Sequence, residues 1–193
     1  MFWYEDIGFR PIEARDLEGI RELRNDPSTW MYLTSARQIG EGEQQKWFGQ
    51  ISDNSRIKYY AVVLCDRHDE APILWESDFI GIIRTDEIDN ENRSMRIGCD
   101  IIPKYRGKGF GSKVYAAMFK YFFDQLNYHR LWLLVLDTNL VAVKLYENAG
   151  MKPEGIQRQA VWRDGAWHNY MMMSILQGEY HELRLRRRAG NER

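Results

Sequence analysis

Three alternating glycines lie between a strand-like stretch and a helix-like stretch. The segment consists of Arg106, Gly107, Lys108, Gly109, Phe110 and Gly111. An extended apolar run precedes it at residues 96–103, and a helix-like run follows at residues 112–126. Glycine lets the backbone approach an anion closely and adopt φ values that other residues avoid. The first turn of the helix would offer unpaired N–H groups and the positive end of its dipole. This order predicts a binding site for a phosphorylated cofactor.

Two common glycine motifs do not fit this segment. A Rossmann fingerprint needs G-x-G-x-x-G, but Ser112 stands where the last glycine belongs. A Walker A loop needs G-x-x-x-x-G-K-[ST], and Gly111-Ser112-Lys113 has a different order. The pattern that remains, [QR]-x-x-G-x-[GA], resembles the acetyl-CoA pyrophosphate loop of the GNAT family of N-acetyltransferases. Taken alone, the segment is equally compatible with a glycine-rich turn of purely structural use.

A second block downstream resembles the other signature of the same family. It runs from Asn139 through Tyr146 to Gly150. Asn139 and Tyr146 are seven residues apart, so on a helix they return to nearly the same face. Gly150 is a natural stop for that helix. The alternative for Tyr146 alone is a half-buried packing residue on an amphipathic helix.

Length and composition predict one compact domain. The chain has 193 residues, of which 44% are hydrophobic, enough for a sizeable core. Its net charge of -1 argues against nucleic acid or an anionic membrane as a partner. No apolar run approaches about 18 residues, so a membrane span is not expected. Cys65 and Cys99 form no disulfide framework, which suits a cytoplasmic location.

Hydrophobic periodicity predicts an alternation of strands and helices. Strands are expected at residues 7–11, 58–64, 78–88, 94–102, 130–135, 155–162 and 167–176. Helices are expected at residues 14–25, 41–52, 109–126 and 140–149. Asp164-Gly165 predicts a hairpin turn between the last two strands.

This order of elements is that of the GNAT fold. The resemblance implies an α/β fold of α+β layers, with a mixed, mostly antiparallel central sheet of six to seven strands and about four flanking helices. A single acetyltransferase domain is expected over residues 1–182. Residues 183–193 are rich in arginine and read as a frayed or disordered basic tail. Contact of this tail with nucleic acid is the less favoured alternative.

The resemblance also implies which residues bind acetyl-CoA, the expected acetyl donor. The backbone of Ile101 and Ile102 would pair with the pantetheine amides, and Asn139 would hydrogen-bond the pantetheine arm or its neighbourhood. Residues 106–111 would hold the diphosphate mainly through backbone N–H groups, with the charges of Arg106 and Lys108 adding attraction. Tyr146 would be the general acid that protonates the departing thiolate. The histidines show no metal-ligand spacing, so no metal is expected.

The general base is harder to assign. Many relatives carry a glutamate where Arg96 stands, and an arginine cannot accept a proton in this pH range. Asp100 is the nearest carboxylate and the candidate base, with Asp86, Glu87 and Glu91 as further candidates. At pH 7 a lysine-like amine with a pKa of ~10.4 costs about 4.6 kcal/mol to deprotonate, and an α-amine near ~7.8 costs about 1. A weak base would therefore suit an α-amine or amino sugar better than a polyamine.

The early helices and the final hairpin are expected to hold the acceptor. They resemble the branch that includes ribosomal-protein N-terminal acetyltransferases and nucleotide-linked amino-sugar N-acetyltransferases. Trp30 and Tyr32 could stack on such an acceptor, or simply pack the helices against the sheet. The predicted function is acetyl transfer to a primary amine, with a protein N-terminus or amino sugar favoured. The alternatives are a polyamine, small-amine or antibiotic acetyltransferase and a non-catalytic acyl-CoA-binding module. Relatives commonly pair, which makes a homodimer possible.

Overall fold

A single eight-stranded sheet forms the centre of the protein. The computed structural model describes residues 1–52, 54–65 and 78–191. The strand order is β1-β2-β3-β4-β5-β6-β8-β7, and neighbouring strands are antiparallel except for the parallel pair β5 and β6. The strands are β1 (Phe2–Tyr4), β2 (Ile7–Pro11), β3 (Lys58–Leu64), β4 (Phe79–Asp89), β5 (Ser94–Ile101), β6 (Arg130–Leu136), β7 (Lys152–Arg163) and β8 (Ala166–Leu176).

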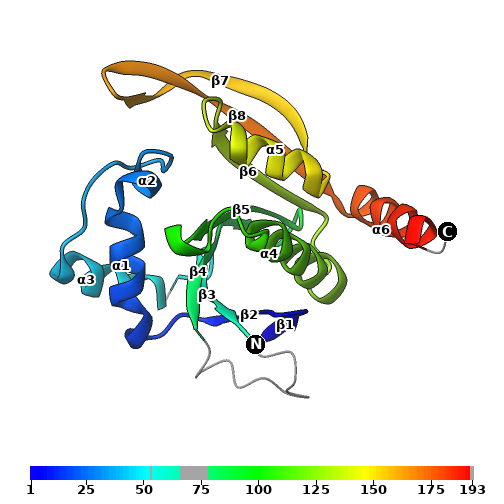
Figure 1. Cartoon of the computed structure of the whole chain (residues 1–193), viewed down its shortest axis with the longest axis horizontal. Helices are drawn as coiled ribbons and strands as arrows, with labels where there is room; N and C mark the ends of the chain where they lie inside the picture. The colour runs from blue at the N-terminus through cyan, green and yellow to red at the C-terminus, as the bar shows by residue number, and fades with distance from the viewer. Residues whose placement is uncertain (53, 66–77, 192–193) are drawn as a thin grey trace.

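Helices cover both faces of this sheet. They are α1 (Leu17–Asn25), α2 (Pro27–Trp30), α3 (Glu41–Ser52), α4 (Phe110–Phe119), α5 (Leu140–Ala149) and α6 (Gln177–Asn191). Figure 1 shows α1 and α3 on one side of the sheet and α4 and α6 on the other. The main hydrophobic core lies beneath α4, and a smaller cluster around Ile20, Leu23 and Ile82 lies beneath α1. Each strand of the middle sheet therefore presents one face to each helical layer.

The predicted fold class is confirmed, with differences in the counts. The described residues form eight strands, not six or seven, because Phe2–Tyr4 adds a short edge strand. They also form six α-helices, because α2 and α6 were not expected. The predicted helix at residues 109–126 is α4 followed by a π-helical segment, Lys120–Gln125. The hairpin turn at Asp164-Gly165 is confirmed, since both residues have positive φ values.

The parallel pair β5 and β6 separates after only three residues. Ser94, Met95 and Arg96 pair with residues 130–132, and β5 has no partner on that side beyond Arg96 among the described residues. On its other edge, β6 pairs with β8 over its whole length. The two central strands therefore open a cleft toward the end of the sheet where β5 stops.

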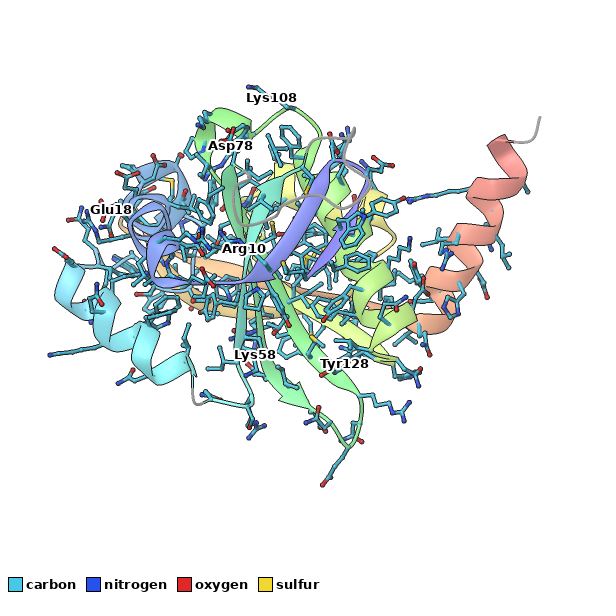
Figure 2. The ribbon with its side chains drawn as sticks, turned by 90° about the horizontal axis from the view of Figure 1, so that it is seen from below. Arg10, Glu18, Lys58, Asp78, Lys108 and Tyr128 are labelled. Atoms are coloured by element: carbon cyan, nitrogen blue, oxygen red, sulfur yellow. The ribbon has the colours of Figure 1, made fainter. Side chains whose placement is uncertain are left out.

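The segment before α1 is fixed by a buried ion pair. Arg10 in β2 donates to Asp16 through both Nη atoms, at 2.7 and 2.8 Å, and both side chains are almost fully buried. Asp16 also accepts the backbone N–H of Glu13, at 2.8 Å. Figure 2 shows Arg10 in the interior of the molecule. This pair holds α1 at a set position over the sheet.

The expectation of a frayed tail from residue 183 is wrong, because α6 extends to Asn191. Three of its residues dock on the rest of the domain. The Tyr180 ring stacks on Phe123 with centroids 5.1 Å apart, and Arg184 forms an ion pair with Asp124 at 2.6 Å. Leu183 packs against the main core. Helix α6 is amphipathic despite its many arginines, and its apolar face packs against the end of α4.

Replacing Gly150 with alanine should destabilise the protein by about 2 to 3 kcal/mol. Gly150 ends α5 in a left-handed conformation with φ 102°. A Cβ atom there would lie 2.2 Å from Leu183 Cδ1, so the change combines backbone strain with a clash against α6. Urea unfolding monitored by circular dichroism measures the loss. Gly155→Ala is the matched control, because a Cβ at Gly155 meets nothing within 4 Å. Equal midpoints for the two variants would contradict this packing of α6.

Among the described residues, no helix is long and apolar enough to cross a membrane.

Candidate active site

A cleft of about 580 Å³ lies where β5 and β6 separate. Its walls come from β5, β6, α5 and the segment around α2. Several of the predicted site residues line it: Tyr32, Asp100, Ile101, Arg106, Gly107, Gly111, Asn139 and Tyr146. Residues from both signature blocks of the sequence therefore meet in one cavity.

The glycine loop presents a row of free donors at one end of this cleft. Gly107 and Gly109 have φ values of 72° and 82°, in the left-handed region that favours glycine. Gly109 is the N-cap of α4, with no side chain capping the helix. Within the described chain, the backbone N–H groups of residues 107–112 donate no hydrogen bond. Figure 2 shows Lys108 at the outer edge of this loop, pointing away from the sheet. The arrangement fits a diphosphate bound by backbone N–H groups at a helix N-terminus.

The hydrogen-bond donors of Arg106 are used within the protein. Its Nε donates to the Ile101 carbonyl at 2.8 Å, and its Nη1 donates to Ser28 Oγ at 2.8 Å. Its Nη2 donates to Thr29 Oγ1. The backbone N–H of Arg106 donates to the Pro103 carbonyl at 3.1 Å. Because its donors are engaged within the protein, Arg106 braces the loop against α2.

Helix α5 carries the second predicted pair of residues into the cleft. Asn139 is the N-cap of α5, and its side chain accepts the N–H of Ala142 at 3.2 Å. The Tyr146 ring lies two turns further along, 5.1 Å from the Tyr115 ring of α4. Burial raises the pKa of Tyr146 to about 12. The phenol therefore keeps its proton at any physiological pH, as a proton donor must.

The two isoleucines at the end of β5 lie in different surroundings. Ile101 lines the cleft, and its carbonyl accepts the Arg106 bond. Ile102 donates its N–H to the Ile80 carbonyl at 2.9 Å and packs in the cluster beneath α1. Its N–H is therefore not free for pantetheine, because the Ile80 carbonyl already accepts it. A contact through the Ile102 carbonyl stays a prediction.

Strand register gathers charged residues on the face of the sheet below α1. In the register between β4 and β5, Ile82 lies opposite Asp100, Arg84 lies opposite Gly98, and Asp86 lies opposite Arg96. Side chains alternate along a strand, so Arg84 and Asp86 share a face with Arg96 and Asp100. Arg96, which stands where a glutamate was expected, donates to Asp86. Asp100 lines the cleft, while Glu87 is paired with Arg96 at 3.3 Å.

Sequence reasoning missed two arginines of this charged face. Arg24 of α1 and Arg84 of β4 line the cleft, as do Tyr115 and Tyr170. The alternation of Arg84 with Asp86 and of Arg96 with Asp100 was visible in the sequence. Their juxtaposition depends on the register between β4 and β5, which the sequence pattern does not give.

Of the two aromatic residues expected to contact the acceptor, Tyr32 lines the cleft and Trp30 does not. Tyr32 is 41% exposed and lines the cleft, so it can contact a ligand there. Trp30 is half-buried at the end of α2 and is not among the lining residues. Trp47 and Tyr59 also line the cleft. Their ring centroids lie 4.8 Å apart in an edge-to-face arrangement.

Neither a metal nor a thiol nucleophile is suggested by the described part of the chain. It contains no group of three His, Cys, Asp or Glu residues placed to hold a metal ion. The Cys99 side chain packs against the main core, and burial raises the pKa of its thiol. A thiol held in its protonated form is a poor nucleophile.

Comparison with known proteins agrees with this geometry. The family described as Acetyltransferase (GNAT) domain matches residues 6–152. A spermidine N(1)-acetyltransferase of Escherichia coli K12 is 26% identical over 175 residues, covering 90% of this chain and 88% of that protein. The crystal structure of a Vibrio cholerae spermidine N-acetyltransferase in complex with CoA and spermine superposes with a TM-score of 0.82 at 25% identity, covering 92% of this chain and 99% of that one.

A dodecameric structure of the Vibrio cholerae enzyme matches with a TM-score of 0.74 at 27% identity, covering 92% of this chain and 97% of that chain. Among the predicted acceptors, these relatives support the polyamine alternative better than a protein N-terminus or an amino sugar. The prediction of an N-acetyltransferase is confirmed. The matched segment includes both the glycine loop and the Tyr146 helix, and this chain belongs to the GNAT acetyltransferase family.

Proposed function

We propose that this N-acetyltransferase moves the acetyl group of acetyl-CoA to a small primary amine in the cleft between β5 and β6. One observation carries the proposal: the same cleft is lined by Tyr146 and by Gly107 and Gly111 of the glycine loop, whose backbone N–H groups donate no hydrogen bond among the described residues. Acetyl-CoA supplies a thioester whose carbonyl carbon the amine attacks. The new C–N bond forms as the C–S bond breaks, and the products are an amide and a free thiol.

The protein's part in this reaction is binding and proton movement. The glycine loop binds the diphosphate, and the unpaired side of β5 beyond Arg96 leaves backbone groups for the pantetheine amides. Tyr146 holds a proton at Oη for the sulfur that departs. Asp100 takes the proton from the amine, directly or through water. Among the described residues its carboxylate has no hydrogen bond or ion pair, and it lines the cleft.

The phenol pKa sets a limit on the proton donor. Transfer from a group of pKa about 12 to a thiolate whose conjugate acid has a pKa near ~8.5 is uphill by about 5 kcal/mol. A turnover of ~10 per second corresponds to a barrier of about 16 kcal/mol, so this uphill proton transfer is smaller than the barrier that such a turnover allows. The Tyr146 phenol can therefore pass its proton to the departing sulfur, and solvent then returns a proton to Oη.

The identity of the acceptor amine is a separate part of the proposal. The relatives named as spermidine N-acetyltransferases support a polyamine. A protein N-terminus or a nucleotide-linked amino sugar, which the low cost of deprotonating such amines favoured, has less support from them. All of these acceptors require the same donor site and the same proton donor.

A thiol-release assay with a panel of amines tests the proposal. Spermidine, a short peptide with a free N-terminus and a nucleotide-linked amino sugar are each offered with acetyl-CoA, and mass spectrometry identifies the acetylated product. We expect turnover with at least one amine and about 100-fold slower turnover in Asp100→Asn at pH 7. Acetyl-CoA that binds without acetylating any amine would favour a non-catalytic acyl-CoA-binding module instead.

A further inference from the structure

The acceptor side of the cleft carries more positive than negative charge. Three arginines, Arg24, Arg84 and Arg96, line it together with two aspartates, Asp86 and Asp100. Arg106 also lines the cleft, and its hydrogen bonds to the neutral oxygens of Ile101, Ser28 and Thr29 leave its positive charge in place. Even without Arg106, three guanidinium groups and two carboxylates give a formal net charge of +1.

The negative charges are not shared evenly among these arginines. Asp86 is held by Arg96 and also lies 3.5 Å from Arg84 Nε. Arg24 has no carboxylate within ion-pair distance among the described residues, although it is half-buried. Burial and the neighbouring charge of Arg84 lower the pKa of Arg24, while the charge of Asp100 acts in the opposite direction. Two guanidinium groups therefore face the cleft with one long ion pair between them, an arrangement that an anion would stabilise.

The backbone makes room for one of these guanidinium groups. Gly98 stands opposite Arg84 in the β4–β5 register. A Cβ atom at Gly98 would lie 2.7 Å from Arg84 Nη2, so any other residue there would push the guanidinium aside. Arg24 lies in the last turn of α1, a helix whose start is fixed by the Arg10–Asp16 pair. The backbone positions from which both cations extend are therefore set by the fold.

We propose that the acceptor amine carries a carboxylate or phosphate group that binds Arg24 and Arg84 while its amino group lies near Asp100. This inference rests on the proposed acetyl transfer and specifies its acceptor. Guanidinium groups bind both kinds of oxyanion through paired hydrogen bonds. The free Asp100 carboxylate then faces the ammonium end of the same molecule. A zwitterionic acceptor matches both charges, whereas spermidine would bring further ammonium groups beside Arg24 and Arg84.

Matched amines test this directly in the same thiol-release assay. Ethanolamine is the neutral reference, β-alanine adds a carboxylate, and phosphoethanolamine adds a phosphate, so the last two distinguish the two sources of anion. Spermidine represents the polycation. We expect kcat/KM for at least one anionic amine to exceed that for ethanolamine and for spermidine by about 10-fold to 100-fold, the range for hydrogen bonds to charged groups.

Variants of α1 then identify the residue responsible. Arg24→Gln should raise KM for the anionic amine about 10-fold with a much smaller effect on ethanolamine, and Arg24→Glu should shift the preference toward spermidine. Arg21→Gln is the control, since Arg21 lies on the same helix, pairs with Glu18 and is not among the lining residues. A spermidine preference that Arg24→Gln leaves unchanged would overturn the inference while keeping acetyl transfer. No turnover with any amine would instead overturn the proposed function.

Discussion

Tyr146→Phe is expected to lower kcat by about 100-fold, the usual contribution of a general acid. The variant keeps the ring that packs 5.1 Å from Tyr115 and removes only the hydroxyl group. Acetyl-CoA affinity should stay within about 2-fold, because in the proposed function the diphosphate binds the glycine loop and not Tyr146. Stopped-flow thiol release gives kcat, and isothermal titration gives the affinity.

A second phenol provides the control for this variant. Tyr128 lies away from the cleft and donates to Asn90 Oδ1 at 3.5 Å, so Tyr128→Phe should turn over at the parent rate.

The pH profile of kcat is an independent test of the role of Tyr146. Since burial raises the pKa of Tyr146 to about 12, the phenol stays protonated and should cause no loss of rate between pH 6 and about pH 10. Parent-like turnover by Tyr146→Phe would remove Tyr146 from the mechanism.

Gly109→Glu is expected to weaken acetyl-CoA binding by about 100-fold, which corresponds to ~2.7 kcal/mol. Two effects combine at this position. A glutamate at φ 82° is strained, at a cost of about 1 kcal/mol or more. Its carboxylate also stands at the N-terminus of α4, where the free N–H groups of the loop would otherwise bind the diphosphate. Isothermal titration with acetyl-CoA measures the change.

Two further variants separate strain from charge at this loop. Gly109→Gln carries the same strain and nearly the same bulk without the charge, so it should lose only about 10-fold in affinity. Gly42→Glu adds the same charge to α3, where a Cβ meets nothing within 4 Å, and should bind normally. If Gly109→Glu binds acetyl-CoA as tightly as the parent, the loop is not the diphosphate site.

Local signals in the sequence were enough to predict the glycine turn, helix α5 and its cap. The glycines at 107 and 109 require positive φ, and Gly150 ends α5 as a left-handed cap. Such features depend on neighbouring residues along the chain, so a linear pattern contains them. Tyr146 and Asn139 belong to one helix, and their common face follows from helical periodicity alone.

The acceptor side depends on contacts between distant segments. Arg84 lies beside Gly98 because of the β4–β5 register, and Arg24 reaches the same cleft only because α1 packs over that face. The short helix α2 was missed because Asn25, Asp26 and Pro27 stop α1, as expected, while Asp26 also caps a new helix by accepting the Ser28 N–H at 2.9 Å. The docking of α6 likewise required Asp124 and Phe123 as partners.

The bonds of Arg106 link the two substrates mechanically. This side chain joins the glycine loop and Ile101 on the donor side to Ser28 and Thr29 of α2 on the acceptor side. A ligand that moves the loop must carry α2 with it or break these hydrogen bonds. Binding free energies at two linked sites change each other by equal amounts. A substrate that shifts these contacts on one side therefore changes the affinity for the other substrate, by the same factor whichever of the two binds first.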